Sequence, residues 1–134
     1  MQTAPHYDNV VSEVSSFLSE RANRLLDKGV DPSRIVLDPG FGFGKTLAHN
    51  LELLQGLRDI VALGFPVLVG LSRKSLLGRI TGRSDSNSRL GGSVAAALFA
   101  VHNGASIVRV HDVAETCAAL QVWQAANNFG VETN

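Results

Sequence analysis

Three apolar runs of this chain each end in polar side chains that could bind a ligand or take part in a reaction. These side chains are Asp38 after the first run, Ser72 and Lys74 after the second, and Arg109 and His111 in the third. A carboxylate can accept two parallel hydrogen bonds, and a guanidinium can donate two to a phosphate. Because the carboxyl ends of parallel strands meet at one rim of an α/β protein, this pattern predicts a ligand site there.

A glycine-rich segment, Asp38-Pro39-Gly40-Phe41-Gly42-Phe43-Gly44-Lys45, follows the first apolar run. Alternating glycines let the backbone take positive φ angles and approach a ligand closely. Two common phosphate motifs do not fit, because a P-loop would need glycine at Pro39 and the dinucleotide fingerprint would need it at Lys45. Phenylalanine rings between the glycines are unusual for a plain turn, so we expect something to cover them.

Arg109 and His111 share one face of the predicted strand 107–111, because side chains alternate along a strand. Their Cα atoms would lie roughly 7 Å apart by the rise of a strand. A guanidinium inside a sheet needs an anionic partner. That partner could be a ligand phosphate, to which His111 would donate a further hydrogen bond, or a carboxylate of the chain such as Asp38. The residues alone leave both interpretations open.

The stretch from Ser72 to Arg109 is rich in cations and contains a single acid, Asp85. The cations are Arg73, Lys74, Arg79, Arg83, Arg89 and Arg109. They could lie on solvated helix faces, or they could form a positive mouth that attracts an anion.

The bulk composition is that of one soluble globular domain. The chain has 134 residues, 45% of them hydrophobic and 18% charged, with a formal net charge of zero. Zero net charge favours neither nucleic acid nor a membrane surface as a partner. Apolar runs stay below the roughly 20 residues of a membrane span. The N-terminus lacks the order of a secretion signal, so we expect a cytoplasmic protein.

Cysteine and histidine offer no obvious metal site. The chain has one cysteine, Cys117, which excludes an internal disulfide, fits a reducing compartment and is expected in helix packing. His6, His49 and His102 lack zinc-ligand spacing, and we expect them at the surface or in loops.

Apolar periodicity predicts one leading helix followed by three βα units. The predicted strands are 35–38, 67–71 and 107–111, and the predicted helices are 10–26, 47–61, 76–80, 94–101 and 112–129. Asp8 is the expected cap of the first helix, and Asp112 with Glu115 has the form of a capping box. The polar, turn-rich stretch 82–88 is predicted to be a loop.

Strand ends spaced by one strand plus one crossover helix favour a parallel sheet, and the continuous apolar run 67–69 suggests burial on both faces. A complete (β/α)₈ barrel takes roughly 250 residues. The predicted fold class is therefore α/β, the C-terminal part of a (β/α)₈ TIM barrel. Such a part has two open sheet edges, which invite pairing with other chains.

Three segments together resemble bacterial dihydropteroate synthase. They are 38–45, already quoted, Gly70-Leu71-Ser72-Arg73-Lys74-Ser75, and Arg109-Val110-His111-Asp112, in the order and spacing of that family. The resemblance covers essentially the whole chain. It implies a partial pterin-binding barrel domain over residues 1–134, without the N-terminal half of the barrel.

The resemblance also implies a reaction and a role for each site residue. The family joins 6-hydroxymethyl-7,8-dihydropterin diphosphate to p-aminobenzoate, with Mg²⁺ accompanying the diphosphate. The implied pterin contacts are Asp38, Gly70 and Lys74; Gly42, Phe43 and Ser72 would contact p-aminobenzoate; Arg109 and His111 would contact the diphosphate. Lys74, Arg109 and His111 would be the catalytic residues.

Two functions remain open at this point. In the first, the chain is part of a transferase and is active only together with the rest of the barrel. We expect this protein to form a homo-oligomer. The second is that of an inactive folded module that binds ligand or oligomerises. The open sheet edges and the small residues of 91–100 favour the second interpretation.

Overall fold

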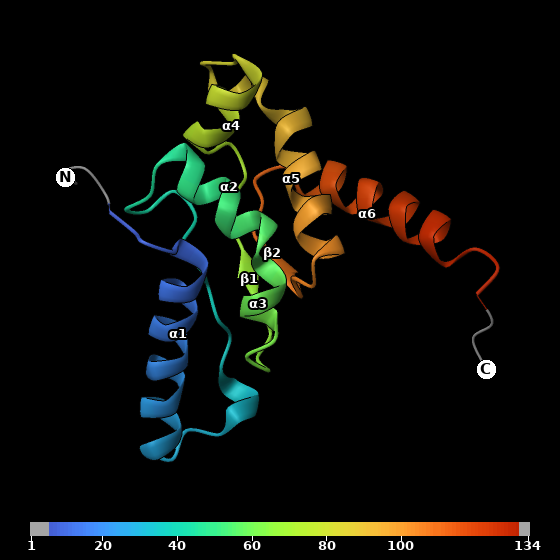
Figure 1. Ribbon diagram of the computed structural model, residues 1–134. Coiled ribbons are helices and arrows are strands. Elements are labelled where there is room, and N and C mark those ends of the chain that lie inside the picture. Colours follow the sequence, from blue (N-terminus) through green and yellow to red (C-terminus); the bar gives the residue numbers. More distant parts are fainter. Residues whose placement is uncertain (1–5, 132–134) are drawn as a thin grey trace.

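Helices flank a short parallel sheet in the computed structural model, which describes residues 6–131 (Figure 1). The α-helices are α1 (Val10–Asp27), α2 (Leu47–Gln55), α3 (Leu57–Val61), α4 (Ser75–Thr81), α5 (Leu90–His102) and α6 (Val113–Asn128). The strands are β1 (Leu68–Val69) and β2 (Ile107–Val108), and the 3-10 helices are η1 (Pro32–Arg34) and η2 (Ser86–Ser88). The predicted order of one helix and three βα units is present.

Three chain segments run parallel at the centre of the molecule. Strand β1 pairs with β2 in the register Leu68 to Ile107, and Leu37 forms a parallel bridge with Val67. The Leu68 amide donates to the Leu37 carbonyl at 2.8 Å, and the Arg109 amide donates to the Val69 carbonyl at 3.0 Å. The predicted strands thus have the right place and direction, although each is shorter than predicted.

The two faces of this sheet have different surroundings. Ile35 and Leu37 are buried, as are the alternate residues of β1 and its flanks, Val67, Val69 and Leu71. On the other face, Val36 is 47% exposed and Ile107 is 41% exposed. The prediction of burial on both faces is therefore wrong for this chain, because its helices cover one face only. Because side chains alternate along a strand, Asp38, Arg109 and His111 belong to this open face.

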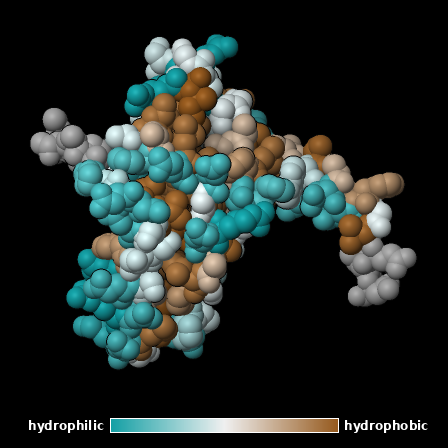
Figure 2. Space-filling view, in the orientation of Figure 1, coloured by the Kyte–Doolittle hydropathy of each residue, from teal (hydrophilic) through white to brown (hydrophobic). Residues whose placement is uncertain are grey.

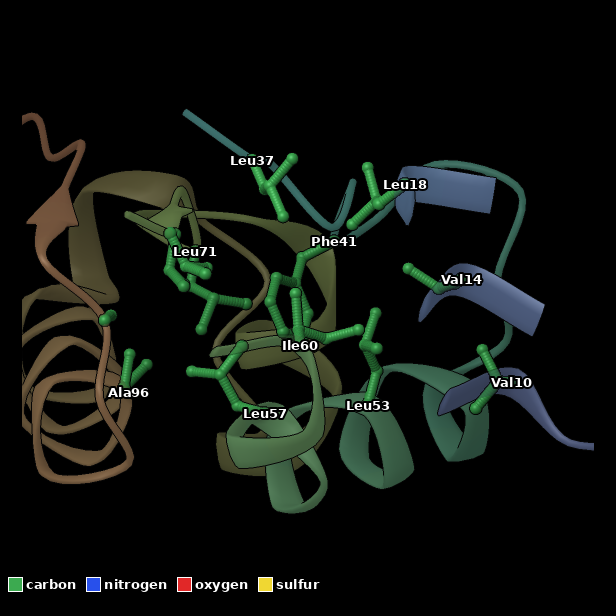
Figure 3. Close-up of a cluster of buried hydrophobic side chains, with 14 of the residues drawn as sticks. Val10, Val14, Leu18, Leu37, Phe41, Leu53, Leu57, Ile60, Leu71 and Ala96 are labelled. Atoms are coloured by element: carbon green, nitrogen blue, oxygen red, sulfur yellow. The ribbon is translucent and has the colours of Figure 1, made fainter. Parts of the chain in front are cut away.

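A cluster of apolar side chains joins the covered face of the sheet to the helices (Figure 3). Helix α1 contributes residues at helical spacing, Val10, Val14, Leu18 and Ala22. Leu53, Leu57 and Ile60 are completely buried. The predicted helix 47–61 is divided into α2 and α3 at Gly56. A Cβ at Gly56 would lie 2.7 Å from a methyl group of Val11, so this glycine lets α1 pack closely against the break.

Helix ends differ from the predictions in two places. Asn9 caps α1 instead of Asp8, and its side chain accepts from the Ser12 amide at 3.0 Å. The predicted capping box at Asp112 does not form, because the Asp112 carboxylate pairs with Arg73.

Helix α6 packs against α5 and is largely exposed. Cys117 is exposed on it, so the prediction that Cys117 takes part in packing is wrong within this chain. Among residues 6–131, none of the helices combines the length and hydropathy that crossing a membrane requires.

Removing a buried side chain of α2 should lower stability much more than removing an exposed one. Leu53 is 0% exposed, so Leu53→Ala should leave a cavity and lower the free energy of unfolding by about 2–5 kcal/mol. Leu25, on α1, is 43% exposed, and Leu25→Ala should cost less than about 1 kcal/mol. Urea denaturation followed by circular dichroism measures both, and equal losses would contradict the described core.

Candidate functional site

The carboxyl ends of the parallel segments meet around a cavity of about 130 Å³. Its lining comes from the residues that follow β1 and β2: Gly70, Ser72, Lys74, Arg109, Val110 and His111. The Arg109 guanidinium lies over Gly70, where an added Cβ would stand 2.5 Å from Nη2. Gly70 thus supplies the space that the arginine occupies.

Asp38 lies beside this cavity and faces Arg109. Its Oδ2 is 4.0 Å from Arg109 Nη1, and the two side chains are 46% and 60% exposed. Its Oδ1 accepts from the Gly40 amide at 2.9 Å. An ion pair this long and this exposed contributes about 1 kcal/mol or less. The internal salt bridge considered from the sequence is present, but it leaves guanidinium donors available to a ligand.

Lys74 lies under the glycine-rich segment. Its Nζ donates to the Phe41 carbonyl at 2.6 Å and lies 5.0 Å from the centre of the Phe43 ring, within range of a cation–π interaction. Gly42 has a φ of +83°, and a Cβ there would lie 3.3 Å from Lys74 Cδ. The structure therefore brings Gly42, Phe43 and Lys74 together.

The two phenylalanines of the glycine-rich segment have opposite environments. Phe41 is 1% exposed and fills the core, whereas Phe43 is exposed. The core thus covers one ring, and the second remains open to a ligand beside Lys74.

Asn50 and Lys45, two residues for which the sequence predicted no role, hold the glycine-rich segment in place. Buried Asn50 accepts from the Gly42 amide at 2.9 Å and donates to the Thr46 carbonyl at 2.9 Å. Lys45 Nζ donates to the carbonyls of Gly40 and Phe43, both at 2.9 Å. One feature of the sequence points to this support: Asn50 is a polar residue at a buried position of the helix α2.

Ser72 joins the end of β1 to the end of β2. Its Oγ lies 2.8 Å from His111 Nδ1 and accepts from the His111 amide at 3.1 Å. Ser72 is 8% exposed whereas His111 is exposed, so only the serine side of these contacts is buried. Both predicted residues line the same cavity, and they contact each other directly.

Arg73 turns the chain between Ser72 and Lys74 with a left-handed φ of 57°. Its amide donates to Ser93 Oγ at 2.9 Å, and its carbonyl accepts from Arg89 Nη1 at 2.8 Å. Its guanidinium donates to Asp112 Oδ1 at 2.9 Å, which holds the pKa of Asp112 below its usual range. These contacts fix a backbone conformation that non-glycine residues rarely adopt.

Fewer cations are therefore available at the cavity than the number of Lys and Arg residues between Ser72 and Arg109 suggested. Arg73 is paired with Asp112, and Arg89 donates to three backbone carbonyls, those of Arg73, Arg83 and Ser84. Lys74 and Arg109 remain at the cavity.

Electrostatics at the cavity favour an anion. Partial burial lowers the pKa of Lys74, and the nearby cations Arg109 and Lys45 lower it further, while Asp38 opposes the shift. Burial likewise lowers the pKa of Lys45, again opposed by Asp38. An anionic ligand would neutralise positive charge that the Asp38 carboxylate offsets only in part.

The residues present do not form a Mg²⁺ site of their own. Residues 6–131 contain no group of three or more His, Cys, Asp or Glu side chains placed to hold a metal ion. Asp38 contacts Arg109 and a backbone amide instead. His49 is half-buried in α2 and caps that helix with Thr46, so the expected surface or loop position is wrong for it. His102 lies at the exposed end of α5, as expected, and packs edge-on against Trp123 at 6.0 Å.

Parallel segments flanked by helices, with a cavity at the carboxyl ends of the strands, are typical of part of an α/β barrel. Residues 1–111 match the sequence model of the family described as pterin binding enzyme, and the chain belongs to this family.

Curated and solved relatives agree with this assignment. The chain is 52% identical over 126 residues to dihydropteroate synthase of Neisseria meningitidis serogroup C, covering 93% of this chain and 44% of that protein. It is similar to Xanthomonas albilineans dihydropteroate synthase in complex with 7,8-dihydropteroate, with a TM-score of 0.91, 52% identity and coverage of 95% and 48%. For dihydropteroate synthase from Thermus thermophilus in complex with 4-aminobenzoate, the TM-score is 0.87, the identity 55%, and the coverage 91% and 49%.

These similarities confirm the resemblance seen in the sequence and the predicted fold class, part of a (β/α)₈ barrel. The chain spans about half the length of the relatives it matches. The roles of individual site residues stay predictions.

Neutralising Arg109 should raise the pKa of Lys74. Arg109 is one of the cations that lower this pKa, so Arg109→Gln removes a repulsion and favours the charged amine. NMR titration of the Lys74 Cε and Nζ resonances measures the change. The control is Arg24→Gln on α1, where Arg24 pairs with Glu20, and it should leave the Lys74 titration unchanged. An unaltered Lys74 titration in Arg109→Gln would contradict the described site.

Proposed function

We propose that this chain is the C-terminal part of a dihydropteroate synthase, which joins 6-hydroxymethyl-7,8-dihydropterin diphosphate to p-aminobenzoate and releases diphosphate and 7,8-dihydropteroate. The observation that carries the proposal is the convergence of one carboxylate with Lys74 and Arg109 around a small cavity. Family membership and relatives with the printed name dihydropteroate synthase support it.

The pterin would bind between Asp38 and Lys74. A carboxylate can accept two parallel hydrogen bonds from the guanidine-like edge of the pterin ring. Asp38 suits this role because Oδ2 has only a 4.0 Å contact with Arg109. Gly70 would border the pterin by leaving room for the Arg109 side chain, and Lys74 would approach the ring from the other side with donors that Phe41 does not use.

The diphosphate would bind Arg109 and His111. In the reaction the C–O bond between the pterin methylene and the diphosphate breaks, and its electron pair goes to the diphosphate. Arg109 and His111 would stabilise that charge, with Lys74 close by. The arylamine nitrogen of p-aminobenzoate then bonds to the methylene carbon and loses a proton.

The p-aminobenzoate site would be lined by Gly42, Phe43 and Ser72. The exposed Phe43 ring offers a face for stacking, and it lies beside Lys74, where the pterin methylene would be. A Thermus thermophilus relative whose structure is described as a complex with 4-aminobenzoate supports this choice of second substrate.

We expect turnover only when the rest of a barrel covers the open face of the sheet. The chain would then act as one pterin-binding domain, residues 1–134, of which 1–5 and 132–134 lie outside the described range. Mg²⁺ would be held by diphosphate oxygens and by groups other than those described here. A cytoplasmic location would suit this biosynthetic chemistry.

An assay with the missing half tests the proposed reaction. This chain, mixed with the N-terminal half of the Neisseria meningitidis enzyme, should form 7,8-dihydropteroate from the two substrates. Asp38→Asn should lower the rate at least about tenfold, because one hydrogen bond to a charged group contributes about 1.5–3 kcal/mol. Arg24→Gln, far from the site, is the control. No product from halves that are folded and associated would rule the proposal out.

We also propose that the chain forms a homo-oligomer through an apolar groove of about 710 Å³ between α2, α4 and α5. Figure 2 shows hydrophobic surface over α4 and α5. Leu51, Ile80 and Phe99 line the groove and are each more than 40% exposed. A second copy of the chain would cover the same face on both partners, as twofold association requires.

Charging the groove should prevent this association. Phe99→Glu would bury a carboxylate in the interface and should shift the chain to monomer in light scattering after gel filtration. Val122→Glu on α6, where Val122 is 71% exposed and outside the groove, is the matched control and should leave the oligomer intact. A monomeric wild-type chain at high concentration would contradict the proposed association.

A further inference from the structure

The hydroxyl of Ser72 has more contacts with His111 than a residue lining a substrate site requires. Its oxygen accepts from the His111 amide at 3.1 Å and lies 2.8 Å from Nδ1 of the same residue. These are the hydrogen bonds that Ser72 Oγ makes within residues 6–131. Both involve one histidine at the end of β2.

Hydrogen counting decides the direction of the contact with Nδ1. A serine hydroxyl has one hydrogen to donate and two lone pairs. The His111 amide takes one lone pair, because a backbone N–H can only donate. If Nδ1 of the neutral ring also carried a hydrogen, the hydroxyl hydrogen of Ser72 would have no acceptor in the described residues. Ser72 is buried, so such an orphaned donor is unfavourable.

We propose that Ser72 is a positioning residue, which donates to Nδ1 and thereby holds neutral His111 as the tautomer with its hydrogen on Nε2. Nε2 has no hydrogen-bond partner within residues 6–131, and His111 lines the cavity with Lys74 and Arg109. The Nε2–H group is then the one ring group available to a ligand. The inference rests on the proposed function, since the ligand is the diphosphate leaving group.

This arrangement makes every nitrogen that faces the diphosphate a hydrogen-bond donor. Lys74 and Arg109 can only donate, whereas a histidine ring can present either a donor or a lone pair. The opposite tautomer would direct the Nε2 lone pair at an anionic oxygen, which is repulsive. Ser72 would thus hold His111 in the form that can donate to an anion. The hydroxyl hydrogen of Ser72 would then not be available to bond the carboxylate of p-aminobenzoate.

NMR of the wild-type chain tests the tautomer without any activity measurement. Ring ¹⁵N shifts and two-bond couplings of His111, recorded at alkaline pH where imidazole rings are neutral, distinguish the two tautomers. We expect the hydrogen on Nε2. A hydrogen on Nδ1, or an even mixture, would overturn the inference. The proposed transferase activity could fail while this result stood, so the two failures are distinguishable.

Variants separate positioning from general packing. Ser72→Ala should allow both His111 tautomers and weaken binding of inorganic diphosphate about three- to tenfold, the range for one lost hydrogen bond. Ser72→Thr keeps the hydroxyl and should restore the Nε2–H signature. The control is Ser93→Ala, which removes another buried serine that bonds Arg73 instead of His111, and it should leave the tautomer unchanged. An unaltered His111 signature in Ser72→Ala would also overturn the inference.

Discussion

The parallel register of β1 against β2 is the constraint on which the site depends. Pairing Leu68 with Ile107 brings the ends of both strands to one rim, where Ser72 meets His111 and Arg109 lies over Gly70. Because side chains alternate, a slip of one residue would turn Arg109 toward the covering helices and leave its charge buried. The apolar residues that anchor the covered face therefore also determine which polar residues reach the open one.

Two kinds of charge interaction surround this rim, and they have different consequences. Arg73 and Asp112 form a short pair that fixes a left-handed turn, so the backbone before Lys74 is set without a ligand. Asp38 and Arg109 form a long, exposed pair that a ligand can replace at little cost. Preorganised backbone beside loosely paired side chains is what binding a polar, anionic substrate requires.

Residue types at strand ends made much of this site predictable. Alternation in an apolar strand was enough to place Arg109 and His111 together, and the length of each βα unit was enough to bring Asp38 and Lys74 to the same rim. Which side chains would contact each other was not predictable, because these contacts depend on distances set by the tertiary structure. Asp112 had the form of a helix cap, yet Arg73 lies close enough to take its carboxylate. Asn50 in an apolar stripe gave the sole local sign of the support under Gly42.

We expect Asp38, Lys74, Arg109 and His111 to surround one anionic ligand. Titration of the wild-type chain with inorganic diphosphate, followed by NMR at Lys74 Nζ, Arg109 Nε and the His111 ring, tests it most directly. The three signals should shift together with one dissociation constant, while Arg24 Nε on α1 stays unchanged. Independent dissociation constants, or shifts at Arg24 as large as those at Arg109, would show that these residues do not form one ligand site.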